Sequence, residues 1–274
     1  MNIEMNKLLD ELKEFDEVVS VVLGGSRSGE NFDDGSDYDL YIYTKEPLPE
    51  EKRNALYEKY CTTFETGNHY FEYEDNIILK NGVHSDIIYR RLADIERYLT
   101  HVIDGGRAFS GYTTCFWHNI IRSRILCDKD GSYEALQKKY DIPYPQKLRD
   151  AIIRKNMNLL HGCLPSYDKQ IMKAIARDDI VSINHRTTAF VESYFDVIFA
   201  MNEKTHPGEK KLIDICKKEC RLLPANFEDN LRKLYHDIYA DTDSVREDLE
   251  NIVKELETVL TGAGLWTAEA GNEK

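Results

Sequence analysis

The chain has 274 residues, of which 42% are hydrophobic and 31% are charged, and its formal net charge is −13 at pH 7. This composition is typical of a globular protein, and the length suggests about two domains. The excess of Asp and Glu argues against binding of the nucleic-acid phosphate backbone. No apolar stretch approaches the ~20 residues that a membrane span requires.

The N-terminal segment and the cysteines indicate in which cellular compartment the protein is located. Residues 1–15 are acidic and have helical spacing, so they lack the basic region and apolar block of a signal peptide. The six cysteines form no C-x-x-C pair, and we expect free thiols. We therefore expect a cytoplasmic protein without membrane contact.

The first half of the chain alternates short helical and strand patterns. In chain order we expect a helix over 6–15, strands over 17–23 and 39–43, a helix from Pro49 to Tyr60, two strands around Asn81 and Gly82 within 69–91, a helix over 94–104, and a strand over 123–127. The run over 17–23 is continuously apolar, which is typical of a strand that is covered on both faces.

From about residue 144 onward, the patterns are helical only. The expected helices span 148–164, 179–204, 208–220 and 227–260, and Pro or Gly residues separate them. We therefore predict an α/β (α+β) protein with a mixed sheet and helices first and an all-α bundle second. The predicted domains are 1–142 and 143–262, followed by a flexible tail over 263–274.

A glycine turn follows the first predicted strand. Gly24 and Gly25 permit a sharp turn with bare backbone N–H groups, and Ser26 adds a hydroxyl donor. The glycine spacings of the P-loop and of dinucleotide-binding folds are absent from this turn. The turn is therefore predicted to bind an anion without either of those motifs.

Two aspartates open the next strand. Asp37 and Asp39 are separated by one residue, so they point to the same face, while Tyr38, Leu40 and Ile42 point into the core. Adjacent carboxylates repel one another unless a cation lies between them. Their hard oxygen atoms suit Mg²⁺ or Mn²⁺.

A third carboxylate, Asp86, interrupts the apolar strand in "GVHSDIIYR". Together, "GGSRSGENFDDGSDYDLYI" and "HSDIIY" resemble the DNA polymerase β nucleotidyltransferase superfamily. Within it, they are similar to bacterial small-substrate nucleotidyltransferases, which include enzymes that adenylylate aminoglycosides and lincosamides. The resemblance covers residues 1–95 best. Ser28 and Gly29 depart from it, because a small residue and a second arginine are common there.

The resemblance implies transfer of a nucleoside monophosphate (NMP) from an NTP, ATP above all, to a hydroxyl of a small molecule, with release of pyrophosphate. Asp37 and Asp39 would hold two Mg²⁺ ions, and Asp86 would be either a third ligand or the base that takes the hydroxyl proton. The residues expected to bind the nucleotide are Gly24, Gly25, Ser26, Arg27 and Lys210.

The predicted helix over 179–204 carries the candidate acceptor contacts. Glu192 and Asp196 lie on one helical stripe with His185, beside apolar residues. This stripe is either a solvated polar face or the acceptor side of the site. In the second case its acidic groups would attract an amine-bearing acceptor.

Two other functions remain open at this stage. Antitoxin-type relatives transfer AMP to proteins, but they are commonly little more than the catalytic domain, which the helical half here exceeds. A nucleotide-binding regulatory module without turnover is the other alternative. The three carboxylates argue against it, because they repel one another in the absence of a metal. The negative charge makes an RNA acceptor the least expected.

Overall fold

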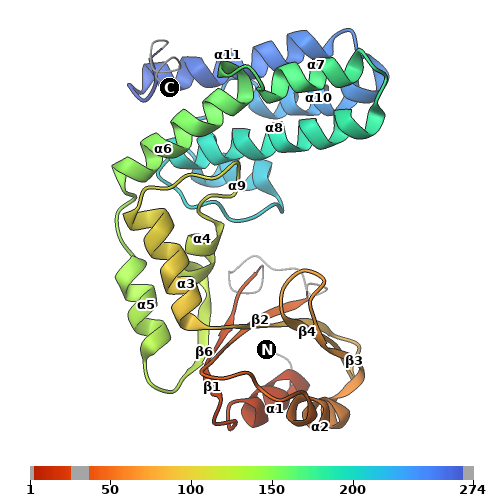
Figure 1. Cartoon of the computed structure of the whole chain (residues 1–274), viewed down its shortest axis with the longest axis vertical. Coiled ribbons are helices and arrows are strands. Elements are labelled where there is room, and N and C mark those ends of the chain that lie inside the picture. The colour runs from red at the N-terminus through yellow and green to blue at the C-terminus, as the bar shows by residue number, and fades with distance from the viewer. Residues whose placement is uncertain (1–2, 26–36, 268–274) are drawn as a thin grey trace. The chain divides into compact units, whose positions relative to one another are not determined.

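The computed structural model describes residues 3–25 and 37–267 (Figure 1). The chain forms two compact units. The N-terminal unit comprises Met1–Leu99 and Phe116–Ile142, and the helical unit comprises Thr100–Cys115 and Pro143–Lys274. The segment Thr100–Cys115 thus packs within the helical unit, although it lies inside the predicted first domain. The boundary near residue 142 stays a prediction.

The described part of the N-terminal unit contains a six-stranded sheet in the order β3-β4-β5-β2-β1-β6. The strands are β1 (Val18–Leu23), β2 (Tyr38–Thr44), β3 (Cys61–Asn68), β4 (Glu74–Leu79), β5 (His84–Arg90) and β6 (Arg124–Asp128). The pair β2–β5 is parallel, and the other neighbouring pairs are antiparallel. The predicted mixed sheet is confirmed.

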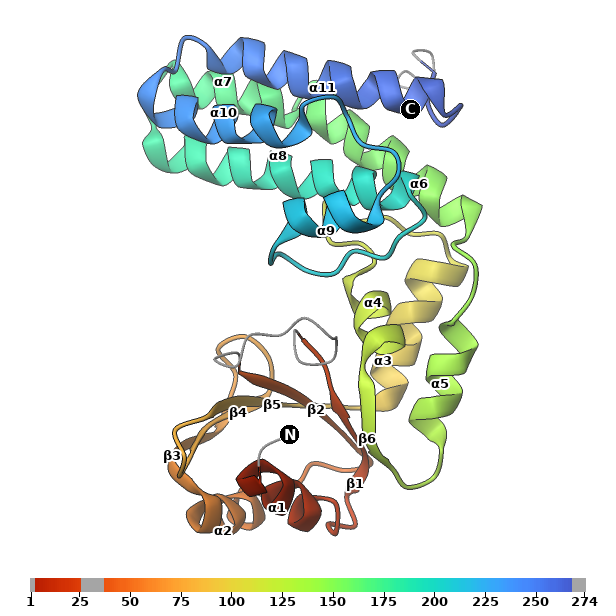
Figure 2. The same ribbon diagram turned by 180° about the vertical axis from the view of Figure 1, so that it is seen from behind.

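The two faces of the sheet differ as the alternation in β2 predicts. Tyr38, Leu40 and Ile42 are buried in the hydrophobic core, to which α1 (Ile3–Leu12) and α2 (Glu50–Tyr60) also contribute. Both helices lie on the same side of the sheet (Figure 2). All six residues of β1 are buried, in agreement with its continuously apolar sequence. The carboxylate of Asp39 therefore lies on the face away from this core.

The remaining helices divide between the units. The N-terminal unit adds α3 (Leu92–Leu99), α4 (Cys115–Arg122) and α5 (Ser132–Tyr140). The helical unit contains η2 (Thr100–Asp104), α6 (Gln146–Met157), η3 (Asn158–Gly162), α7 (Tyr167–Ile175), α8 (Ile180–Met201), α9 (Leu212–Glu219), α10 (Phe227–Ala240) and α11 (Val245–Gly262). No helix of the described chain is both long enough and apolar enough for a membrane span.

Four parts of the chain differ from the prediction. Strand β3 was missed, because its residues Thr62 and Thr63 are exposed and carry no apolar alternation. Helices α5 and α7 were not predicted as separate elements. The single helix expected over 227–260 is two helices, because a turn closes between them with a Ser244 Oγ to Asp241 Oδ2 hydrogen bond of 2.7 Å.

Candidate active site

Parallel pairing of β2 and β5 brings two of the predicted carboxylates together. Asp39 and Asp86 are direct partners in the register of these strands. Partners in neighbouring strands point to the same face, and both residues are half-buried there. Asp37 is exposed immediately before β2. The sheet thus forms a carboxylate pair, with a third carboxylate close in sequence.

The chemistry of this pair is suited to a hard divalent cation. Carboxylate oxygens are the ligands that Mg²⁺ uses in proteins, and Asp39 and Asp86 present theirs from adjacent strands. Among the residues with described positions, no group of three or more His, Cys, Asp or Glu side chains is arranged to hold a metal ion. The predicted three-carboxylate metal site is therefore still a prediction.

The glycine turn is shaped by side chains of β2. The Gly24 N–H donates to the Asp39 carbonyl at 2.9 Å. A Cβ on Gly24 would lie 2.4 Å from Tyr41 Cε2, and a Cβ on Gly25 would lie 1.6 Å from Asp39 Oδ2. Gly25 also has φ +60°, which an L side chain rarely adopts. Both positions require glycine so that the turn can lie against the carboxylate strand. The predicted Ser26 and Arg27 fall outside the described residues.

Gly25→Ala is expected to weaken binding of a Mg²⁺–ATP analogue ~10-fold or more, because the new methyl group would displace the Asp39 carboxylate. Titration calorimetry measures the affinity. Gly82→Ala is the control, since Gly82 has φ +83° and no atom within 4 Å of the added Cβ. It should lower the melting temperature through the same backbone strain and leave the affinity unchanged. Wild-type affinity in Gly25→Ala would contradict the prediction.

Strand β4 adds polar side chains beside Asp86 that the sequence interpretation missed. Asn76 is the register partner of Asp86, and its Nδ2 donates to Asp86 Oδ1 at 2.8 Å. Glu74 lies two residues earlier and is buried. Burial, and then the charge of Asp86, raise the pKa of Glu74. The available signal was the polar run Glu74–Asn76 at the start of an otherwise apolar strand.

The two predicted acceptor residues on α8 have different environments. Glu192 is half-buried and lies against the 109–115 segment, where a Cβ on Gly111 would come within 2.8 Å of Glu192 Cβ. Burial, and then the Glu209 carboxylate, raise the pKa of Glu192. Lys210 is exposed just before α9.

Asp196 is interior, at 2% exposure. It accepts hydrogen bonds from the Thr113 N–H at 3.1 Å, the Thr113 hydroxyl at 2.6 Å and Asn156 Nδ2 at 3.1 Å. Asn156 Oδ1 in turn accepts from the Gly111 N–H at 3.3 Å. Asp196 and Asn156 therefore fasten the 109–115 segment onto the helices of the helical unit.

The buried Asp196 predicts a pH-dependent stability. Burial raises its pKa to about 7, although the donors from Thr113 and Asn156 act in the opposite direction. The native protein then holds a proton that the unfolded chain has already released, so stability falls as the pH rises from about 4 to about 7. We expect Asp196→Asn to flatten this dependence. Melting temperatures measured across that range test it, and an unchanged slope in the variant would contradict it.

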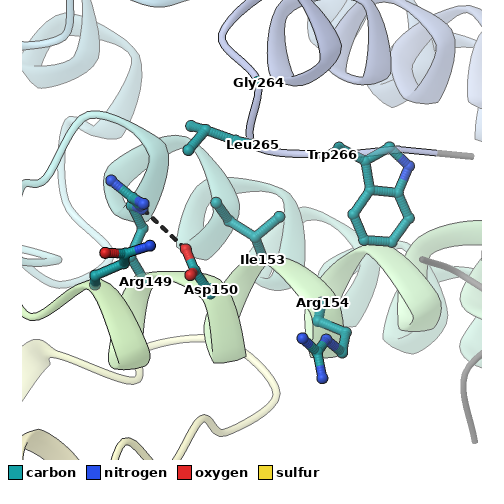
Figure 3. A pocket seen from close by; sticks show the side chains of 8 residues that line it. Arg149, Asp150, Ile153, Arg154, Gly264, Leu265 and Trp266 are labelled. Atoms are coloured by element: carbon teal, nitrogen blue, oxygen red, sulfur yellow. Dashed lines mark hydrogen bonds and ion pairs between the residues drawn. The ribbon is translucent and has the colours of Figure 1, made fainter.

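Two hollows lie on the helical unit. One, of about 200 Å³, lies between α6 and the Gly264–Trp266 segment (Figure 3). In it, Arg149 is paired with Asp150 at 3.1 Å and, elsewhere, with Glu203 at 2.8 Å. The other is an open depression of about 470 Å³, lined by Arg107, Arg154 and Lys155, among others. None of the predicted site residues lines either hollow.

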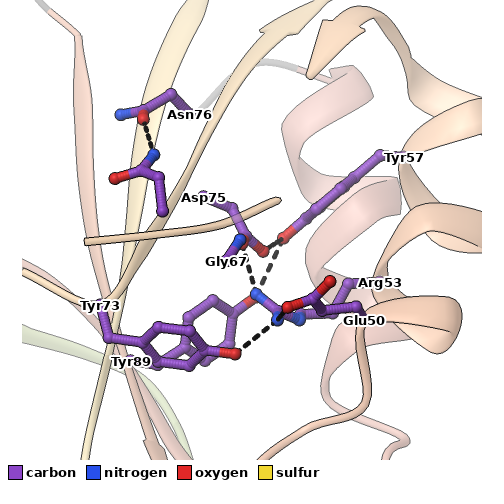
Figure 4. Close-up of polar contacts among 9 residues, drawn as sticks. Glu50, Arg53, Tyr57, Gly67, Tyr73, Asp75, Asn76 and Tyr89 are labelled. Atoms are coloured by element: carbon purple, nitrogen blue, oxygen red, sulfur yellow. Dashed lines mark hydrogen bonds and ion pairs between the residues drawn. The ribbon is translucent and has the colours of Figure 1, made fainter. Parts of the chain in front are cut away.

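A buried polar network supports the sheet from the face opposite Asp86. Arg53 of α2 pairs with Asp75 of β4, and both side chains are fully buried (Figure 4). Asp75 also accepts from the Tyr57 hydroxyl at 2.7 Å and from the Gly67 N–H at 2.8 Å. Burial disfavours the charged guanidinium, but the Asp75 carboxylate offsets this and the pKa of Arg53 is raised. The network anchors β4 between α2 and the end of β3.

The mixed sheet, the glycine turn against a carboxylate strand and the paired aspartates agree with the domain that the resemblance implies. Residues 5–104 match the family model described as a nucleotidyltransferase domain. Residues 116–212 match a second model, described as a domain of unknown function. The first match confirms the resemblance of residues 5–104 to the DNA polymerase β superfamily, so the chain contains a nucleotidyltransferase domain.

Solved structures with a similar arrangement include two bacterial proteins. A nucleotidyltransferase-like protein from Exiguobacterium sibiricum is 12% identical with a TM-score of 0.42, and the match covers 95% of this chain and 75% of that one. An aminoglycoside 6-adenyltransferase from Bacillus subtilis is 12% identical with a TM-score of 0.34, at 99% and 95% coverage. These values are too low to carry a statement about this chain. No curated protein matches the sequence.

Proposed function

We propose that the protein transfers an NMP from an NTP, ATP above all, to a hydroxyl of a small molecule and releases pyrophosphate. The observation that carries this proposal is the pairing of Asp39 with Asp86 on adjacent parallel strands, next to the glycine turn. Nucleotidyl transfer requires that the charge of the phosphates is neutralised and that the reacting groups are aligned. A divalent metal ion bound by the two carboxylates would do both.

The predicted site residues of the N-terminal unit have these proposed roles. Asp37, Asp39 and Asp86 would hold Mg²⁺ or Mn²⁺, which when bound neutralises the charge of the phosphates. Asp86 serves either as a ligand or as the base for the acceptor hydroxyl. The backbone of the turn at Gly24 and Gly25 and the side chains of Ser26 and Arg27 would hold the triphosphate.

The proposed acceptor is a small hydroxylated, amine-bearing molecule of the aminoglycoside or lincosamide type, which would make the protein an antibiotic-resistance enzyme. Glu192 is the candidate contact, because it is half-buried and has Glu209 near it, so that an ammonium group would relieve their repulsion. Asp196 is not part of the proposed acceptor site, because its buried oxygens accept hydrogen bonds from Thr113 and Asn156.

The test is incubation of the purified protein with each NTP and Mg²⁺ against aminoglycosides, lincosamides and lysate proteins, followed by mass spectrometry. An NMP adduct on a small molecule, lost when EDTA is added, is the expected result. An adduct on a protein would favour the antitoxin-type alternative. Absence of any adduct, together with tight NTP binding, would indicate a regulatory module.

A further inference from the structure

We infer that Asn76 is a positioning residue that fixes the carboxylate of Asp86 for catalysis; this inference rests on the proposed function. Asn76 comes from β4, the neighbour of β5 on the side away from Asp39. Its Nδ2 donates to Asp86 Oδ1 at 2.8 Å, between register partners of the two strands. The hydrogen bond therefore turns one oxygen of Asp86 toward β4.

The orientation of the Asn76 amide follows from its two contacts. Asn68, at the end of β3, donates from its Nδ2 to Asn76 Oδ1, and Asn76 donates to the Asp86 carboxylate. A flipped amide would set Asn76 Oδ1 against a carboxylate oxygen and its NH₂ against another NH₂ group. The relay Asn68–Asn76–Asp86 thus has one direction, which ends on the carboxylate.

The need for such a relay comes from the neighbouring strand. Asp39 and Asp86 are register partners, and like charges on adjacent strands repel each other. A carboxylate in this position can relieve the repulsion by rotating about its side-chain bonds. The Asn76 amide of β4 opposes this rotation, because the rotation would break its hydrogen bond with the Asp86 carboxylate. Asn76 therefore holds Asp86 Oδ1, and because the carboxylate is planar, the position of Asp86 Oδ2 is restricted as well.

The test is a double-mutant cycle of Asn76→Ala and Asp86→Asn with two measurements. One is the Mn²⁺ dissociation constant from electron paramagnetic resonance, and the other is kcat for NMP transfer. Asp86→Asn is expected to change the Mn²⁺ dissociation constant, kcat or both. Asn76→Ala should change the same measurements in the same direction, by ~10–100-fold. It should add nothing in the double variant, because its effect passes through Asp86.

Two further variants keep the result decisive. Asn76→Val removes the donor with a residue that favours strands, and should reproduce Asn76→Ala if the latter folds poorly. Glu65→Gln changes the exposed register partner of Asn76 on β3 and should leave both quantities unchanged. If the wild-type protein transfers no NMP, the proposed reaction is refuted. The Mn²⁺ dissociation constants of the variants would still test whether Asn76 acts through Asp86. Multiplying losses in the double variant, or no loss in Asn76→Val, would overturn the inference.

Discussion

Asp39→Asn is expected to transfer NMP at least ~10³-fold more slowly than the wild-type protein, because several kcal/mol of charge stabilisation at the phosphates would be lost. Asn has nearly the same shape as Asp, so the contact with the glycine turn persists. Repulsion with Asp86 is relieved at the same time. We therefore expect the melting temperature to stay equal or to rise.

The measurement is the initial rate of pyrophosphate release at saturating Mg²⁺ and NTP, with the melting temperature recorded for each variant. Asp75→Asn is an instructive comparison, since Asp75 belongs to β4 and lies in the buried network on the opposite face of the sheet. It should lose stability and keep activity below its melting temperature. Near wild-type turnover in Asp39→Asn would refute the proposed role of the carboxylate pair.

Arg53→Met is expected to destabilise the N-terminal unit by ~3–5 kcal/mol, because the buried Asp75 carboxyl group would lose its cationic partner. Both side chains of the pair are fully buried. Lys52→Met is the matched control at the preceding residue. Lys52 pairs with Glu17, and this pair is more exposed than the pair of Arg53 with Asp75. Its expected cost is ~1 kcal/mol or less.

The two tryptophans make this measurement specific to one unit. Trp117 is buried in the N-terminal unit, and Trp266 belongs to the helical unit. In a Trp266→Phe background, fluorescence during urea denaturation therefore follows the N-terminal unit. Equal losses in Arg53→Met and Lys52→Met would show that the buried pair contributes no more than a surface pair. The Arg53→Met, Asp75→Leu double variant should recover part of the loss.

Much of the sheet was predictable because its information is local. The apolar run of β1 and the alternation in β2 predict which residues are buried, and they place Asp39 on the face away from the core. The requirement for glycine at position 25 was also predictable from the turn, although its cause was not. The cause is the side chain of Asp39, which approaches from the following strand.

The sequence by itself determined the mixed-sheet and helical halves, the face on which Asp39 lies, and the carboxylate types that point to nucleotidyl transfer. Only the tertiary structure decided that β5 lies between β2 and β4, so that Asp86 has Asp39 on one side and Asn76 on the other. It also decided that Asp196 is interior, because the distant 109–115 segment covers α8 and supplies its donors. Local patterns specify which face a side chain takes. Its neighbours come from strand pairing and packing between segments far apart in the chain, which no local pattern encodes.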